Sequence, residues 1–85
     1  MNEQEIDLMD ELYFVQSYKD IKNELKWGDS VLQENLLSLH QKEFIKILVN
    51  HDEEYRANTY NPHEMDWEGL YFLATKKGLL EHNGF

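Results

Sequence analysis

Hydrophobic positions repeat with a helical period in the first half of the chain and form short, dense runs in the second half. Between residues 3 and 15, four apolar residues fall at the spacing of one helical face: Leu8, Met9, Leu12 and Val15. Carboxylates cluster in the first turns, where the helix dipole favours them. We expect a helix over 3–15. Tyr13 and Phe14 widen its apolar face for the core or for a partner subunit, and we favour the core.

A second helix is predicted directly after Ser17, which is a favourable N-cap with Asp20 three residues later in the manner of a capping box. Its apolar positions are Tyr18, Ile21 and Leu25. We expect this helix to end near Trp27, because Gly28 suits the left-handed residue that closes a helix.

A third helix is predicted to start with Asp29 or Ser30 as its cap. Its core stripe, at the spacing i, i+4, i+7, is Leu32, Leu36 and Leu39. The short connection makes the second and third helices neighbours, which predicts a helix-turn-helix over 17–43.

The dense apolar runs predict a hairpin. Residues 44–49, FIKILV, and 70–74, LYFLA, are typical of strands and are expected to pair antiparallel, with a short third strand near Gln16. The connection 50–69 holds the only proline and a run of charges, and a loop of this length is often functional or mobile. Thr75 is then expected to cap a last short helix.

Two segments at the ends of this hairpin resemble the winged-helix family. Residues 39–45, LHQKEFI, are similar to its pattern Leu-x-x-x-Gly-apolar-Ile, and residues 71–78, YFLATKKG, to aromatic-x-Leu-x-Thr-x-x-Gly. Glu43 replaces the usual glycine at a left-handed turn, at a cost of about 1 kcal/mol, so we expect that turn to be wider or differently shaped. The ending FLATKKGLLEHN is also similar to that of small bacterial proteins, which implies no function.

The resemblance implies a mainly α fold with a small β-hairpin: a winged helix-turn-helix with a three-helix core, a two-stranded wing and a short C-terminal helix. We expect one domain over 1–85. Its parts would be helix 1 over 1–16, the helix-turn-helix over 17–43, the wing over 44–74 with its acidic loop 50–69, and the C-terminal helix and tail over 75–85.

Composition narrows the functional classes. The chain has no cysteine, which excludes disulfides and thiolate zinc sites. Its start is too acidic for a signal peptide, and no apolar run approaches the roughly 20 residues that span a bilayer. We expect a cytoplasmic protein. The net charge of −9 repels polyanions.

DNA binding is the usual function that the resemblance implies, with residues 29–42 as the recognition helix. Amide side chains in that helix have the chemistry to contact adenine. The candidate DNA-contact residues are Gln33, Asn35, Ser38, Lys42 and Arg56. However, the helix has no arginine, and loop 50–69 holds six carboxylates against Arg56 alone. Since DNA affinity depends on neutralising phosphates, we rank this hypothesis second.

The hypothesis that we favour is a non-enzymatic protein-interaction module, such as a small regulatory or adaptor protein, with an acidic wing directed at a basic partner. Homodimerisation through helix 1 is a special case. Aromatic side chains often dominate interfaces. The candidate anchors are Trp27, Leu37, Tyr55, Tyr60 and Trp67, and the alternative for each is plain packing, which for Tyr60 and Trp67 would fold the long loop onto the domain.

An enzyme is the weakest hypothesis. The chain has no cysteine nucleophile, GxSxG, glycine-rich phosphate loop or HExxH, and Ser17, Ser30 and Thr75 are explained as helix caps. We expect no cofactor. Several potential metal ligands share the long loop, but their spacing fits no EF-hand, and we expect no metal site: His51, Asp52, Glu54, His63 and Asp66.

Overall fold

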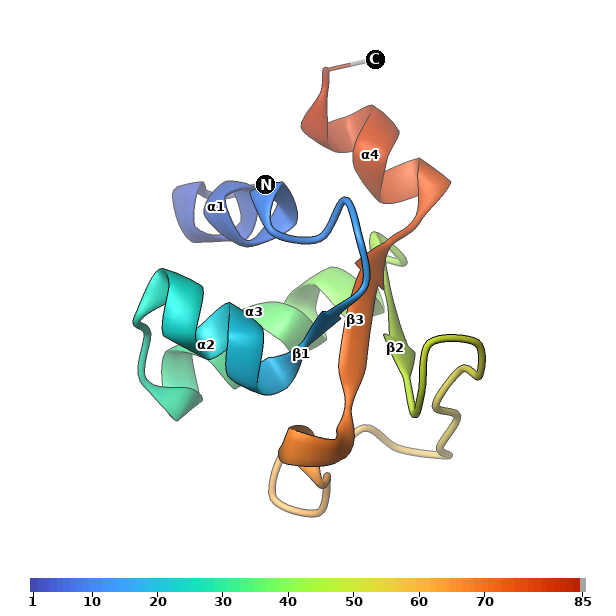
Figure 1. The fold of residues 1–85 in the computed structure, drawn as a ribbon. Coiled ribbons are helices and arrows are strands. Elements are labelled where there is room, and N and C mark those ends of the chain that lie inside the picture. Colours follow the sequence, from blue (N-terminus) through green and yellow to red (C-terminus); the bar gives the residue numbers. More distant parts are fainter. Residues whose placement is uncertain (85) are drawn as a thin grey trace.

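Four α-helices pack with a three-stranded antiparallel sheet in the computed structural model, which describes residues 1–84 (Figure 1). The result is a small mixed α/β fold. Its elements in chain order are α1 (Glu3–Asp10), β1 (Gln16–Ser17), α2 (Tyr18–Leu25), α3 (Asp29–Gln41), β2 (Ile45–Leu48), the 3-10 helix η1 (Trp67–Gly69), β3 (Tyr71–Ala74) and α4 (Lys76–His82).

The strands lie in the order β1-β3-β2, so the last strand of the chain occupies the centre of the sheet. In β2 and β3 the register places Ile45 opposite Ala74 and Ile47 opposite Phe72, which confirms the predicted antiparallel hairpin. Gln16 pairs with Phe72 on the other side of β3, so the short third strand is also confirmed.

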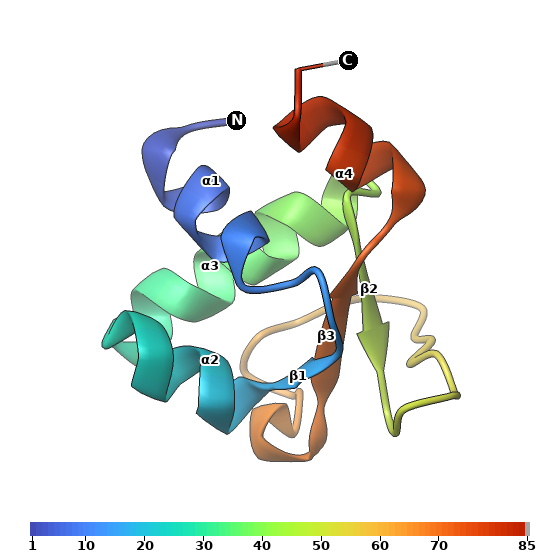
Figure 2. The ribbon, with the colours of Figure 1, turned by 45° about the horizontal axis from the view of Figure 1, so that its top comes forward.

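The core forms where α1, α2 and α3 lie together on one face of the sheet (Figure 2). The predicted leucine stripe of α3 is fully buried there, as are two residues of α1, one residue just after α1 and one in the middle of β3: Leu32, Leu36, Leu39, Leu8, Met9, Leu12 and Phe72. Each buried side chain of this size contributes about 1.5–3 kcal/mol to stability.

The first helix is shorter than predicted. It ends at Asp10, with Glu11 as its C-cap, and the chain then turns toward β1. The Leu12 carbonyl accepts a 2.9 Å hydrogen bond from the Ala74 N–H, so this backbone pairs with β3 instead of continuing the helix. Tyr13 and Phe14 consequently point away from the core, and Phe14 is 79% exposed. The prediction that they pack in the core was wrong.

The turn between α2 and α3 also differs from the prediction. Lys26, not Gly28, takes the left-handed conformation that closes α2, with a φ of 59°. Gly28 is instead the extended N-cap of α3, and Asp29 is the first helical residue. Asp29 accepts hydrogen bonds from the Tyr18 hydroxyl at 2.6 Å and from Lys22 at 2.9 Å, so its carboxylate is engaged with α2. The predicted Ser17 cap of α2 is confirmed by its 3.1 Å bond from the Asp20 N–H.

The turn from α3 into β2 contains Glu43 in a left-handed conformation, with a φ of 65°. The expectation of a differently shaped turn was therefore wrong: the left-handed turn forms with glutamate in it. Thr75 caps α4 as predicted, accepting a 3.0 Å bond from the Gly78 N–H. Its own main-chain N–H donates to the Phe44 carbonyl at 2.9 Å, which joins the start of α4 to this turn.

Over the described residues 1–84, none of the helices has both the length and the apolar character needed to cross a membrane.

Candidate functional site

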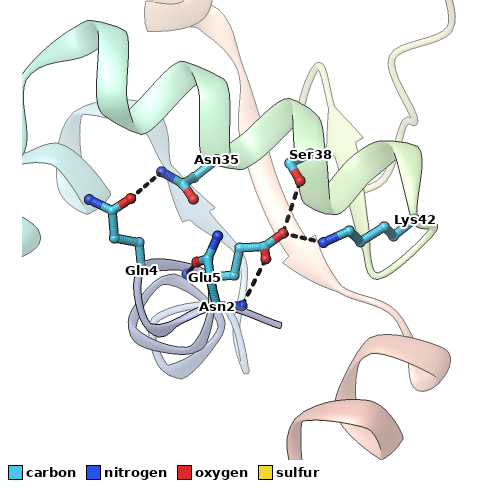
Figure 3. A network of polar contacts seen from close by, with 6 residues as sticks. All are labelled: Asn2, Gln4, Glu5, Asn35, Ser38 and Lys42. Carbon is cyan, nitrogen blue, oxygen red and sulfur yellow. Dashed lines mark hydrogen bonds and ion pairs between the residues drawn. The ribbon is translucent and has the colours of Figure 1, made fainter.

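Three of the five candidate DNA-contact residues lie on the side of α3 that packs against α1 (Figure 3). Asn35 is 7% exposed and donates hydrogen bonds to the Val31 carbonyl at 2.9 Å and to Gln4 at 3.4 Å. Ser38 and Lys42 both donate to Glu5 of α1, at 2.9 and 2.8 Å. The expectation that Asn35 faces a DNA groove was wrong, because its side chain is buried against α1, whereas Ser38 and Lys42 bond to Glu5 and remain partly exposed.

Glu5 is the centre of this contact and is only 2% exposed. Its carboxylate also accepts a 3.0 Å hydrogen bond from the Asn2 N–H, while the Asn2 side chain accepts one from the Glu5 N–H at 2.8 Å (Figure 3). Burial alone would raise the pKa of Glu5, but the hydrogen bonds from Lys42, Asn2 and Ser38 together outweigh it and lower the pKa. The hydrogen bonds of Glu5 with Asn2, Ser38 and Lys42 hold α1 against α3. We call these four residues the clamp.

Sequence reasoning missed this clamp. Asn2 and Glu5 have the spacing of a capping box, which was the one available local pattern. The partners on α3 lie 33 and 37 residues further along the chain, and no local spacing predicts such a pair.

The other two candidate DNA-contact residues lie elsewhere. Gln33 is half-buried and donates a 3.2 Å hydrogen bond to the Tyr18 hydroxyl. Arg56 is exposed on the long loop and forms a 3.5 Å ion pair with Glu54. Of the five residues, Gln33 and Ser38 line one groove along α3, whereas Asn35 is buried against α1 and Arg56 lies on the loop.

Among the candidate anchors, Trp67 belongs to the core. It is 6% exposed, its ring lies against those of Tyr18 and Phe72 with centroid distances of 5.5 and 6.2 Å, and its Nε1 donates a 2.9 Å hydrogen bond to the Pro62 carbonyl. This is the packing alternative considered for it, so Trp67 is not a surface anchor. Trp27 is half-buried and packs against the edge of the core.

Leu37 and Tyr60 line one hollow with His40, although they are 23 residues apart in the sequence, and Tyr55 contacts Tyr60. The Tyr60 ring lies 4.3 Å from that of His40 and 5.8 Å from that of Tyr55, and its hydroxyl donates to the Tyr55 carbonyl at 3.3 Å. Burial lowers the pKa of His40, and the negative charge of Glu54 opposes that shift. Neutral His40 is therefore the favoured form beneath Tyr60.

A groove runs along the outward face of α3, between that helix and the long loop. Its larger part, of about 630 Å³, is lined chiefly by Gln33, Glu34, Leu37, Ser38, Gln41, Pro62 and His63. Past Leu37 and Gln41 it continues into a smaller hollow of about 360 Å³ that His40 and Tyr60 complete. We call this surface the α3 groove. Neither part is lined by a lysine or an arginine.

The loop that forms the far wall of the α3 groove is tied to the domain at both ends. Near β2, the Val49 N–H donates to Glu53 at 2.8 Å and the Tyr55 N–H donates to Ile47 at 2.7 Å. The loop then crosses behind β3 on its way to η1 (Figure 2). There the indole of Trp67 holds Pro62, so the groove wall is fixed by the core.

The potential metal ligands of the loop are not gathered. Within residues 1–84, no group of three or more histidine, aspartate and glutamate side chains is placed to hold a metal ion. The ring of His51 lies 5.1 Å from that of Tyr71, whereas His63 lies at the α3 groove.

No protein-family model, curated protein or solved structure matches this chain.

Proposed function

We propose that the chain is a non-enzymatic protein-interaction module on a winged-helix scaffold, and that its binding surface is the α3 groove. The observation that carries this proposal is the groove itself. It combines the apolar side chains of Leu37 and Pro62 with the amides of Gln33 and Gln41, a mixture typical of surfaces that bind peptides.

The order of elements supports the winged-helix part of the proposal. A helix, a short strand, two helices and a hairpin follow one another, and the strands lie in the order β1-β3-β2. The two segments that resemble the family, 39–45 and 71–78, meet in space, since Thr75 Oγ1 donates a 2.7 Å hydrogen bond to the Glu43 carbonyl.

Two features count against DNA binding. Asn35, Ser38 and Lys42 are held against α1, and the opposite side of α3 is bordered by Pro62 and His63 of the loop. The groove also offers no lysine or arginine for phosphates, in a chain whose net charge is −9. The negative charge of the protein would therefore repel duplex DNA, and α1 and the loop would cover part of the helix face that DNA must contact.

The proposal is tested with peptides selected from a random display library against the purified protein. Gln41→Trp fills the α3 groove from an exposed position, and Asn23→Trp places the same side chain on the exposed face of α2. We expect peptide affinity, measured by fluorescence anisotropy, to fall at least tenfold in the first variant and to stay within twofold in the second.

DNA is the second arm of the experiment. A random-sequence duplex in low salt should give no mobility shift at micromolar protein. A shift that Gln41→Trp abolishes would overturn the proposal in favour of a DNA-binding regulator.

A further inference from the structure

We infer that the α3 groove takes a basic amphipathic peptide segment, with one large apolar side chain seated between Leu37 and Tyr60 and with lysine or arginine beside it. This inference rests on the proposed function and names the class of partner. It follows from the apolar, electrostatic and mechanical properties of the groove.

The apolar subsite is the smaller hollow. Leu37 forms one side of it and the Tyr60 ring the other, with His40 between them. Because burial lowers the pKa of His40, its neutral ring adds to the apolar surface at neutral pH. An aliphatic or aromatic side chain matches this lining, and burial of such a side chain is the usual source of affinity at an interface.

The charges around the groove select a basic partner. Glu34 is exposed and lines the groove on the α3 side, and Glu64, the sequence neighbour of the lining residue His63, is also exposed. Arg56 is the cation of the loop, but it is paired with Glu54. A lysine or arginine near the apolar anchor would therefore meet the negative charge of Glu34, and the net charge of −9 would speed its approach.

The same charges argue against a second copy of this chain as the occupant. Two copies would each bring a net charge of −9 to the contact. This repulsion acts while the two copies are still approaching each other, so it slows their association.

The groove is also largely formed before any partner binds. Trp67 Nε1 donates a hydrogen bond to the Pro62 carbonyl, and the Tyr60 hydroxyl donates one to the Tyr55 carbonyl, so two of the three loop residues that line the groove are held in place. A fixed wall lowers the entropy cost of binding, because little of the loop must be ordered by the partner.

The test begins with the sequences selected from the random display library. We expect enrichment of lysine and arginine next to one aromatic or aliphatic residue. Glu34→Lys reverses the charge of the α3 wall, while Glu81→Lys makes the same change on the exposed face of α4. Affinity for a selected peptide in low salt should fall at least fivefold in Glu34→Lys and less than twofold in Glu81→Lys.

The outcomes separate the two proposals. Selected peptides that lose binding in Gln41→Trp but contain no excess of basic residues would overturn the basic partner and leave the interaction site. Equal losses in Glu34→Lys and Glu81→Lys would do the same. Selection of no peptide, or binding that Gln41→Trp leaves unchanged, would overturn both. Should Glu34→Lys unfold, Glu34→Gln replaces it, with a smaller loss expected.

Discussion

Thr75 Oγ1 donates a 2.7 Å hydrogen bond to the main-chain carbonyl of Glu43, 32 residues earlier in the chain. The same threonine caps α4, so one hydroxyl joins the turn before β2 to the first turn of the last helix. Around this bond the backbone of α4 comes close to that of Phe44.

Gly78→Ala should destabilise the domain strongly. A Cβ at this position would lie 2.1 Å from the Phe44 carbonyl oxygen, and a backbone atom cannot move aside as a flexible side chain would. We expect a loss of about 3 kcal/mol or more in the free energy of unfolding, measured by urea denaturation. The matched control is Gly28→Ala, where a Cβ meets nothing within 4 Å; a comparable loss there would contradict the explanation.

Glu43→Gly should stabilise the domain. Glu43 has a φ of 65°, which is strained for a residue with a Cβ and free of strain for glycine. Glycine also has more conformational freedom in the unfolded chain, which offsets part of the benefit. We expect a net increase of about 0.5–1 kcal/mol in the free energy of unfolding. Glu43→Ala keeps the strain and loses the same carboxylate, so it should show no gain. Equal stability of the two variants would rule out strain as the cause.

Lys42→Met should destabilise the clamp around Glu5. The substitution removes the 2.8 Å ion pair but keeps most of the aliphatic stem, and it leaves a buried carboxylate without its cation. We expect a loss of about 1–2 kcal/mol at neutral pH, moderated because Lys42 is half-exposed. Lys77→Met is the control, since its 3.7 Å pair with Glu43 is exposed on both sides and should matter little.

The acid side of the stability curve gives a second measurement of the clamp. The pKa of folded Glu5 is lowered, so its contribution is present above the unfolded value of about 4.3 and is lost as the pH falls through the folded pKa. In Glu5→Gln this part of the pH dependence should disappear. In Lys42→Met the hydrogen bond and charge of Lys42 no longer lower the pKa of Glu5, so the folded pKa moves up toward or past the unfolded value and the loss on the acid side should become smaller.

Trp67→Ala should remove a large part of the stability of the domain. Removal of the buried indole, which lies against Tyr18 and Phe72, would leave a cavity. Such a change typically lowers the free energy of unfolding by about 3–5 kcal/mol. Trp67→Phe keeps most of the packing but loses the hydrogen bond to Pro62. We expect it to lower the free energy of unfolding by about 1 kcal/mol. Thermal and urea unfolding separate the three proteins. An unchanged melting temperature in Trp67→Ala would show that Trp67 is not a core residue and would support its role as a surface anchor.

Local patterns were enough to predict most of the elements. The leucine stripe of α3, the cap at Ser17 and the dense apolar run of β2 each depend on neighbours a few residues away. The errors occurred where distant contacts decide the outcome. The first helix ends early because the backbone after it pairs with β3, and Asp29 is drawn to Tyr18 and Lys22.

The site was harder to predict than the fold for a related reason. The buried stripe of α3 has two flanks, one with Asn35 and Lys42 and the other with Gln33 and Leu37, and Ser38 both contacts Glu5 and lines the groove. Both flanks are polar enough to be exposed, and helical spacing does not say which of them meets α1. Glu5 decides this, through contacts with residues more than 30 positions away.

The indole of Trp67 belongs both to the core and to the support of the α3 groove. Pro62 cannot move away from α3 without breaking the 2.9 Å bond to the indole nitrogen. The exchange of that single indole proton with solvent therefore reports on the width of the groove. A partner that fills the groove should slow this exchange, even though it never touches the tryptophan.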